Sequence, residues 1–270
     1  MQRRFLLALP VLIGAGSALR AMAMPGAPAV LPDAPICRGG LRRVAELQER
    51  DSSTPAAVDA DYLEKLGLLE GHLLIGRQLL EAGQSRLAVP HFGHPIRELY
   101  TWLEPRMERR RVAGFEAELQ VMEAWAEGGN TGTGGRFDAA WQGLAPKLAA
   151  AKAAIAPTLK ASPRFMLGHV AMMVYDVASD YGESIERGRI VNVVEYHDSM
   201  GFLAYAANAA KAGRAGGRAE AEWTEAEAIL EDLRRIAYPE LLPPGRVPAS
   251  VSSVRSRSNR IQAIAERVQA

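Results

Sequence analysis

The sequence predicts an all-α protein, either an antiparallel helical bundle or a short helical solenoid. From Leu41 onward, apolar side chains recur every three to four positions, which is the period of a helix with one buried face. Alanine is abundant, and leucine, glutamate, arginine and glutamine fill many other positions; these residues lose least on entering a helix. No stretch alternates apolar and polar residues between turns, as a half-buried strand would.

The expected helices are separated by residues that typically end or begin a helix. Gly83 suits the end of one helix, and Ser162 followed by Pro163 suits an N-cap with proline in the first turn. No segment resembles an interdomain linker, so residues 41–270 are expected to form a single all-helical domain. The expected helices are 41–50, 59–82, 85–104, 113–127, 136–155, 163–186, 189–212, 218–237 and 250–268.

The first 23 residues have the layout of a secretory signal peptide. Arg3 and Arg4 form a charged start, residues 5–13 form an apolar run, and residues 21–23 form a small-x-small cleavage signal. The apolar run is too short to anchor the chain in a bilayer. The layout predicts export to the periplasm or beyond. The two arginines before large apolar residues also fit a twin-arginine signal, so the export route stays open.

Residues 24–40, which follow the leader, are rich in proline, glycine and alanine and are expected to form a disordered lead-in. Cys37 lies in this segment and is the only cysteine, so the chain can form no internal disulfide. An exported protein of this length is therefore expected to be held together by its apolar core.

The charge of the chain argues against nucleic acid as a partner. The chain has 32 basic and 31 acidic residues, and removal of the leader takes away three arginines and no acid, which leaves a charge near −2. A chain so close to neutral lacks the positive surface that attracts phosphates or anionic membranes. No later segment reaches the roughly 18 to 20 consecutive apolar residues of a spanning helix, so no membrane span is expected in the mature chain.

Residues 72–100 carry large, small and aromatic residues at the spacing of two short antiparallel helices. The pattern consists of His72, Ile75, Gly76, Leu79, Gly83, Ala88, Phe92 and Pro95. It resembles one unit of the tetratricopeptide repeat, in which small residues let two helices approach and large residues fill the seam. The pattern does not recur at a spacing of about 34 residues. The resemblance implies a helical hairpin that serves as a scaffold or binding surface.

Recognised catalytic signatures are absent from the sequence. It contains no His-Glu-x-x-His, no paired Glu-x-x-His of di-iron bundles, no Cys-x-x-Cys-His for haem attachment and no Gly-x-Ser-x-Gly elbow. Nothing in the sequence argues for an enzyme, and these absences do not exclude one.

All five histidines lie within expected helices. His91, His94 and Glu98 follow the spacing His-x-x-His-x-x-x-Glu, which places three metal-capable groups on neighbouring turns of one helix face. Pro90 and Pro95 disturb the hydrogen bonding of this helix, so we expect it to bend beside His91 or to start there.

A second polar stripe lies on one face of the expected helix 163–186. His169, Asp176, Asp180 and Glu183 follow one another at steps of seven, four and three residues. The rest of this helix is apolar enough to be buried, and buried carboxylates need arginine, a backbone group or a metal ion as a partner. A polar stripe that faces water is the other interpretation.

The next expected helix contributes Glu195, His197 and Asp198. If these two helices pack together, imidazoles and carboxylates converge inside a bundle, as they do in metal and haem sites.

The sequence predicts a function through binding. The main hypothesis is an exported, non-catalytic helical scaffold of the cell envelope that binds a protein partner or a small ligand. The alternative is a bundle that binds a transition metal or haem through inward-facing histidines and carboxylates. A carrier for an apolar small ligand is a third hypothesis, which requires an internal cavity. The candidate metal ligands are His72, His91, His94, His169, Asp176, Asp180, Glu183 and His197.

Overall fold

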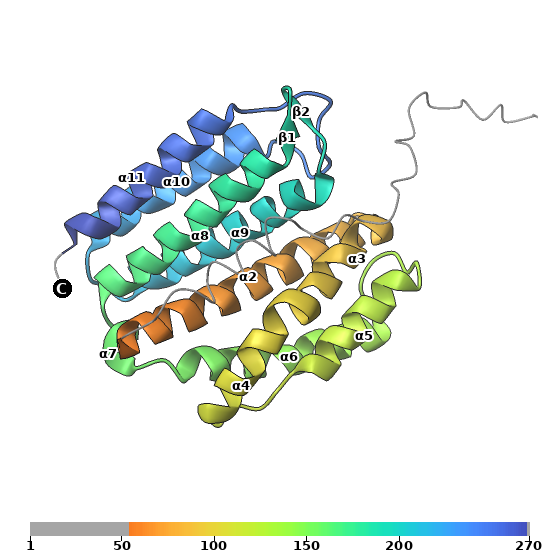
Figure 1. The fold of residues 1–270 in the computed structure, drawn as a ribbon, viewed down its shortest axis with the longest axis horizontal. Coiled ribbons are helices and arrows are strands. Elements are labelled where there is room, and N and C mark those ends of the chain that lie inside the picture. Colours follow the sequence, from red (N-terminus) through yellow and green to blue (C-terminus); the bar gives the residue numbers. More distant parts are fainter. Residues whose placement is uncertain (1–53, 269–270) are drawn as a thin grey trace, which may run out of the picture. The chain divides into compact units, whose positions relative to one another are not determined.

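Helices make up most of the chain that the structure, a computed structural model, describes, namely residues 54–268 (Figure 1). This confirms the predicted all-α class. The predicted signal peptide 1–23, lead-in 24–40 with Cys37, and helix 41–50 lie outside the described residues. Within residues 54–268, no helix is both long and apolar enough to cross a membrane.

The first half of the described chain begins with a long helix, which a turn connects to a second helix, so that the two form a helical hairpin. Thr54 caps the first helix through its side chain, and Gly83, with a φ of 76°, makes the turn that follows it. The elements of this half are α2 (Pro55–Glu81), α3 (Ser85–His94), η1 (Pro95–Tyr100), α4 (Thr101–Arg109), α5 (Glu116–Glu127) and α6 (Gly135–Ala153).

The second half contains four long helices that pack as a bundle. Helix α8 packs against α9 and α11, and α10 also packs against α9 and α11 (Figure 1). As expected, Ser162 caps α8, since its hydroxyl accepts a hydrogen bond from the amide of Phe165. The elements are α7 (Pro157–Lys160), α8 (Pro163–Glu183), β1 (Ile185–Glu186), β2 (Arg189–Ile190), α9 (Val193–Ala215), α10 (Glu220–Ala237) and α11 (Val251–Arg267).

Local features of the helices differ from the sequence prediction. The expected helix 189–212 starts later, at Val193, because a short antiparallel hairpin precedes it; its two-residue turn, Arg187 and Gly188, has positive φ at both positions. The expected helix 85–104 begins at Ser85 as predicted, and not at His91, but its first segment, α3, ends at His94 and is followed by Pro95. There the hydrogen-bond pattern widens to that of a π-helix, because Pro95 has no N–H to donate to the preceding turn.

Helix α2 links the two halves because its backbone lies against that of α9. A side chain on Gly71 would meet the ring of Phe202 at 2.6 Å and the Phe202 amide at 3.1 Å. A side chain on Gly201 would overlap the backbone carbonyl of Gly71. On its other side α2 packs against α3, where Gly76 lies under the ring of Phe92. These positions therefore require glycine, because the neighbouring helix leaves no space for a side chain.

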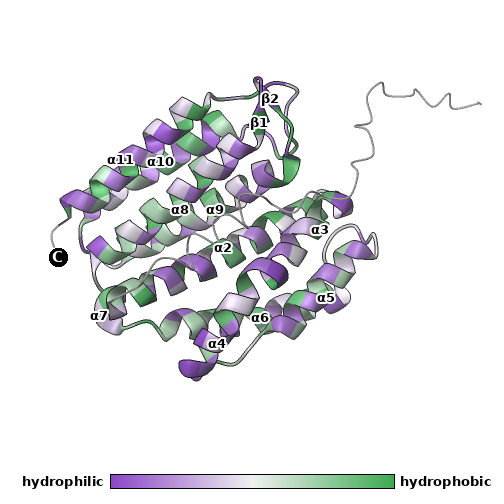
Figure 2. Cartoon of the chain, viewed as in Figure 1, coloured by the Kyte–Doolittle hydropathy of each residue, from purple (hydrophilic) through white to green (hydrophobic). Residues whose placement is uncertain are grey.

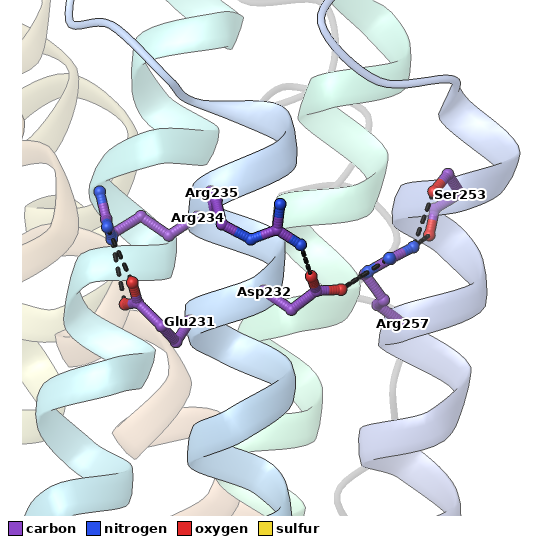
Figure 3. A network of polar contacts seen from close by, with 6 residues as sticks. All are labelled: Glu231, Asp232, Arg234, Arg235, Ser253 and Arg257. Atoms are coloured by element: carbon purple, nitrogen blue, oxygen red, sulfur yellow. Dashed lines mark hydrogen bonds and ion pairs between the residues drawn. The ribbon is translucent and has the colours of Figure 1, made fainter.

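Apolar packing holds these helices together. Figure 2 shows hydrophobic and hydrophilic residues interspersed along the helices, as expected of elements with one buried face. On the bundle surface, Asp232 of α10 accepts hydrogen bonds from Arg235 at 2.5 Å and from Arg257 of α11 at 2.6 Å (Figure 3). Ion pairs that remain in contact with water stabilise a fold only slightly, so these pairs contribute little to holding α11 in place.

The close crossing of α2 and α9 gives a test of the fold. Substitution Gly201→Ala is expected to lower the free energy of unfolding by about 1–3 kcal/mol, because the added methyl group overlaps the Gly71 backbone. Gly168→Ala is the matched control, since nothing lies within 4 Å of a methyl group at that position of α8. It should leave stability unchanged or raise it slightly. Chemical unfolding followed by circular dichroism measures both, and equal effects would argue against the crossing.

Candidate metal centre

Three helices bring polar side chains to the interior beside the α2–α9 crossing. Asp198 lies on α9 one turn before Gly201, and His72 follows Gly71 on α2. His91 lies on α3, where its Cβ would be 3.2 Å from a side chain on Gly76. The same close helix contacts that require glycine therefore bring these two imidazoles to the Asp198 carboxylate.

One carboxylate oxygen contacts both imidazoles. Nδ1 of His72 lies 2.6 Å from Oδ1 of Asp198, and Nδ1 of His91 lies 2.7 Å from the same atom. Asp198 and His91 are at most 1 % exposed, and His72 is 5 % exposed. One donor atom from each of the three residues can be chosen such that all lie within 4.8 Å of one another, so that these residues could hold a metal ion.

The two imidazole contacts differ in kind. His91 is hydrogen-bonded to the carboxylate. The Nδ1 atom of His72 is equally near, but among the described residues it has no hydrogen-bond partner, because the contact lacks hydrogen-bond alignment.

The charges in the cluster are those that metal ligands need. Burial by itself would raise the pKa of Asp198, but interactions with His72 and His91 outweigh it and hold the pKa well below its usual value. The carboxylate is therefore ionised. Burial lowers the pKa of His91, more than Asp198 raises it, so that this imidazole is neutral near pH 7. An ionised carboxylate and a neutral imidazole are the forms that bind metal ions.

His94 and Glu98 lie next to this group. Nδ1 of His94 is 3.8 Å from the other carboxylate oxygen, Oδ2 of Asp198. Burial lowers the pKa of His94, but Asp198 and Glu98 outweigh it, so the pKa is raised. Burial raises the pKa of Glu98, and His94 and His72 only partly oppose that shift. Glu98 is thus within electrostatic reach of the cluster, from the π-helical segment η1.

His197, which directly precedes Asp198 on α9, lies against His91. The two ring centroids are 5.6 Å apart, and Nε2 of His197 lies 3.1 Å from the carbonyl oxygen of Leu241. Burial, with a smaller contribution from His91, lowers the pKa of His197 to about 4. Within the described residues, Nε2 of His91 and Nδ1 of His197 are buried without a hydrogen-bond partner. Buried polar atoms of this kind often face a bound ion or water.

The other predicted ligands do not belong to the group of three. His169 is hydrogen-bonded to the hydroxyl of Tyr205 at 3.0 Å. Asp176 and Asp180 are buried on α8, whereas Glu183 on the last turn is exposed, so the predicted stripe does not stay on one buried face. The list of candidate ligands omitted Asp198 and Glu98. The spacing His91-x-x-His94-x-x-x-Glu98 pointed to Glu98, but only the packing of α9 onto α2 and α3 reveals Asp198.

Comparison with protein families gives one match, over residues 156–270, which is less than half of the chain. This segment is similar to the iron permease-associated 4-helix bundle domain. It contains α8, α9, α10 and α11, the four long helices that pack as a bundle, and it includes Asp198. His72 and His91 lie outside it. Comparisons with curated proteins and with solved structures found no match.

The match corrects two predictions. The tetratricopeptide-repeat assignment was wrong, since the family found is a four-helix bundle domain. The residues behind that assignment do form a hairpin of α2 and α3, but small residues at a helix crossing are common to many helical hairpins. The main functional hypothesis, a scaffold of the cell envelope, was also wrong, because the matched domain is associated with iron transport. The alternative, a metal-binding bundle, agrees better with this finding.

The buried His169 predicts how stability depends on pH. Burial, together with the charge of Lys152, lowers its pKa to about 3. A histidine in the unfolded chain has a pKa near 6.5, so as the pH falls the unfolded chain binds this proton first. The free energy of unfolding is therefore unaffected by this titration above about pH 6.5. Below that pH it falls progressively, by up to about 1.4 kcal/mol per pH unit.

Substitution His169→Gln removes this titration and can keep a hydrogen bond to Tyr205. Unfolding free energies measured in urea at several pH values between about 4.5 and 6.5 should therefore fall less steeply for the variant than for the native chain. Equal slopes would show that His169 is not held neutral in the folded protein.

Proposed function

We propose that this protein binds a divalent transition-metal ion, with Fe(II) as its physiological ion, between helices α2, α3 and α9. The ligands are His72, His91 and Asp198. The observation that carries the proposal is the buried Asp198 carboxylate, which has imidazole nitrogens of two other helices at 2.6 and 2.7 Å from one oxygen.

The donor atoms favour a transition metal over other cations. Ca²⁺ and Mg²⁺ prefer oxygen ligands, whereas the group of three offers two imidazoles and one carboxylate. The group contains no sulfur ligand, which Cu(I) prefers. Two histidines and one carboxylate with open positions are a common set for Fe(II) in proteins.

A metal ion fits the geometry better than haem, the other cofactor considered from the sequence. His72 and His91 contact the same oxygen of Asp198, so this carboxylate lies between the two imidazoles. A porphyrin held by the two histidines would have to occupy the position of that carboxylate. An ion, in contrast, would use the carboxylate as a ligand.

The family match supports iron as the ion. The matched segment is similar to a domain described as iron permease-associated, and Asp198 comes from this segment. The imidazoles come from helices that precede it, so the ion would bind where the matched bundle meets the first half of the described chain. Bound metal would then stabilise the packing of α9 against α2 and α3.

Metal-dependent stability tests the proposal. Anaerobic Fe(II) at about 100 times its dissociation constant should add about 2.7 kcal/mol to the free energy of unfolding. In a chain of this size that raises the melting temperature by roughly 5–10 °C. Substitution Asp198→Asn should reduce affinity by more than about 100-fold, because even residues that only support a ligand contribute about 10- to 100-fold. The shift in melting temperature at the same Fe(II) concentration should then largely disappear.

His169→Gln is the matched control, since it changes a buried histidine that is hydrogen-bonded to Tyr205 and not to Asp198. It should keep the full Fe(II)-induced shift, even if its melting temperature without metal is lower. Ca²⁺ and Mg²⁺ should produce little shift with any variant. An undiminished Fe(II) shift in Asp198→Asn would place the ion elsewhere, and no shift in the native chain would refute metal binding.

A further inference from the structure

Two neighbouring imidazoles each have one buried nitrogen without a hydrogen-bond partner among the described residues. These atoms are Nε2 of His91 and Nδ1 of His197. Both side chains are fully buried, and their ring centres lie 5.6 Å apart in an edge-to-face arrangement. A buried polar atom without a partner costs free energy, so such atoms in a folded protein usually point to a group or a state that satisfies them.

The other nitrogen of each ring is hydrogen-bonded, and this bond determines where the proton of the ring lies. Nδ1 of His91 is hydrogen-bonded to Oδ1 of Asp198 at 2.7 Å, and an ionised carboxylate can only accept. Nε2 of His197 is hydrogen-bonded to the carbonyl oxygen of Leu241 at 3.1 Å, and a carbonyl can also only accept. The proton of His91 is therefore on Nδ1, and the proton of His197 is on Nε2.

Both unpartnered nitrogens consequently carry a lone pair. A neutral imidazole has one N–H, so Nε2 of His91 and Nδ1 of His197 can each accept a hydrogen bond but cannot donate one. Two acceptors cannot satisfy each other. A proton on one of them would allow an N–H···N hydrogen bond between the two rings, which the distance of 5.6 Å between the ring centres permits.

Binding of the proposed ion moves a proton to this place. Nδ1 is the nitrogen of His91 that faces the carboxylate of Asp198, the other ligand. To bind an ion through Nδ1, His91 must offer the lone pair of that atom, which the proton occupies in the arrangement above. If the proton leaves Nδ1 and Nε2 of the same ring takes one up, the imidazole stays neutral and no proton is released in total.

We propose that His197 is a positioning residue for the metal ligand His91. When an ion binds to Nδ1 of His91, the proton of this ring is on Nε2 and is donated to Nδ1 of His197. Both unpartnered nitrogens are then satisfied, and His197 is itself held by the carbonyl of Leu241. Histidines that bind a metal almost always donate their other N–H to a fixed acceptor, which orients the ring. This inference rests on the proposed function.

The position of the proton on His91 tests the inference directly. Nitrogen-15 NMR distinguishes the two neutral forms of histidine, and Zn(II) is a suitable probe because it is diamagnetic and binds imidazole and carboxylate ligands. In the full chain near neutral pH, His91 should carry its proton on Nδ1 without metal and on Nε2 with saturating Zn(II). His197 should carry its proton on Nε2 in both states. A His91 that keeps its proton on Nδ1 in the Zn(II) complex would overturn the inference.

Two substitutions of His197 separate its role as an acceptor from its bond to Leu241. The amide oxygen of His197→Asn can replace Nδ1 as an acceptor, whereas the amide nitrogen of His197→Gln can replace Nε2 as the donor to Leu241. Competition with a chromogenic chelator measures Zn(II) affinity. It should fall by about 10- to 100-fold in His197→Gln and stay close to native in His197→Asn. The reverse order would show that His197 acts through Leu241 and not through His91.

His169→Gln is the matched control, because it makes the same change at a buried histidine that is hydrogen-bonded to Tyr205. It should bind Zn(II) like the native chain, and Asp198→Asn should bind Zn(II) weakly. Loss of affinity in Asp198→Asn together with native affinity in His197→Gln would refute this inference alone. If both variants of His197 bind weakly, the NMR result on the native chain decides. If the native chain binds neither Zn(II) nor Fe(II), both proposals are wrong.

Discussion

The buried carboxylate of Asp198 is the interaction on which the rest of the site depends. An ionised carboxylate inside a protein costs several kcal/mol unless other groups compensate for its lost hydration. In this protein imidazoles on α2 and α3 compensate, and they approach the carboxylate of α9 to 2.6 and 2.7 Å. A rearrangement of α2 or α3 would take away one of these two imidazoles. Helix packing and the candidate function therefore rely on the same contacts.

Backbone packing explains why these side chains meet. Gly71 and Gly201 let α2 and α9 touch, and Gly76 lets α3 lie close on the other side of α2. His72 directly follows one of these glycines, and Asp198 lies one turn from another. Ligands that stand on packed helices are held in place before an ion arrives, so little conformational freedom is lost on binding. The segment similar to the iron permease-associated domain supplies the carboxylate, and the preceding helices supply the imidazoles.

The sequence was sufficient to predict the helices, because helical periodicity and caps such as Ser162 are local properties. It also drew attention to His91, His94 and Glu98, whose spacing is local too. It could not show that Asp198 is the partner that His72 and His91 share. That contact depends on the packing of α9 against α2 and α3, which brings together residues more than a hundred positions apart in the sequence. For the same reason it grouped His169 with these residues, although Tyr205 is its partner. The short hairpin before α9 was missed because two-residue strands carry no periodic signal.

The most direct test of the account is the position of the bound ion. Crystals of the full chain grown anaerobically with Fe(II) would show it through anomalous scattering measured at the iron absorption edge. We expect an anomalous peak among the imidazoles of His72 and His91 and the carboxylate of Asp198. Peaks that occur only at surface carboxylates, with the three side chains left as they are without metal, would contradict it.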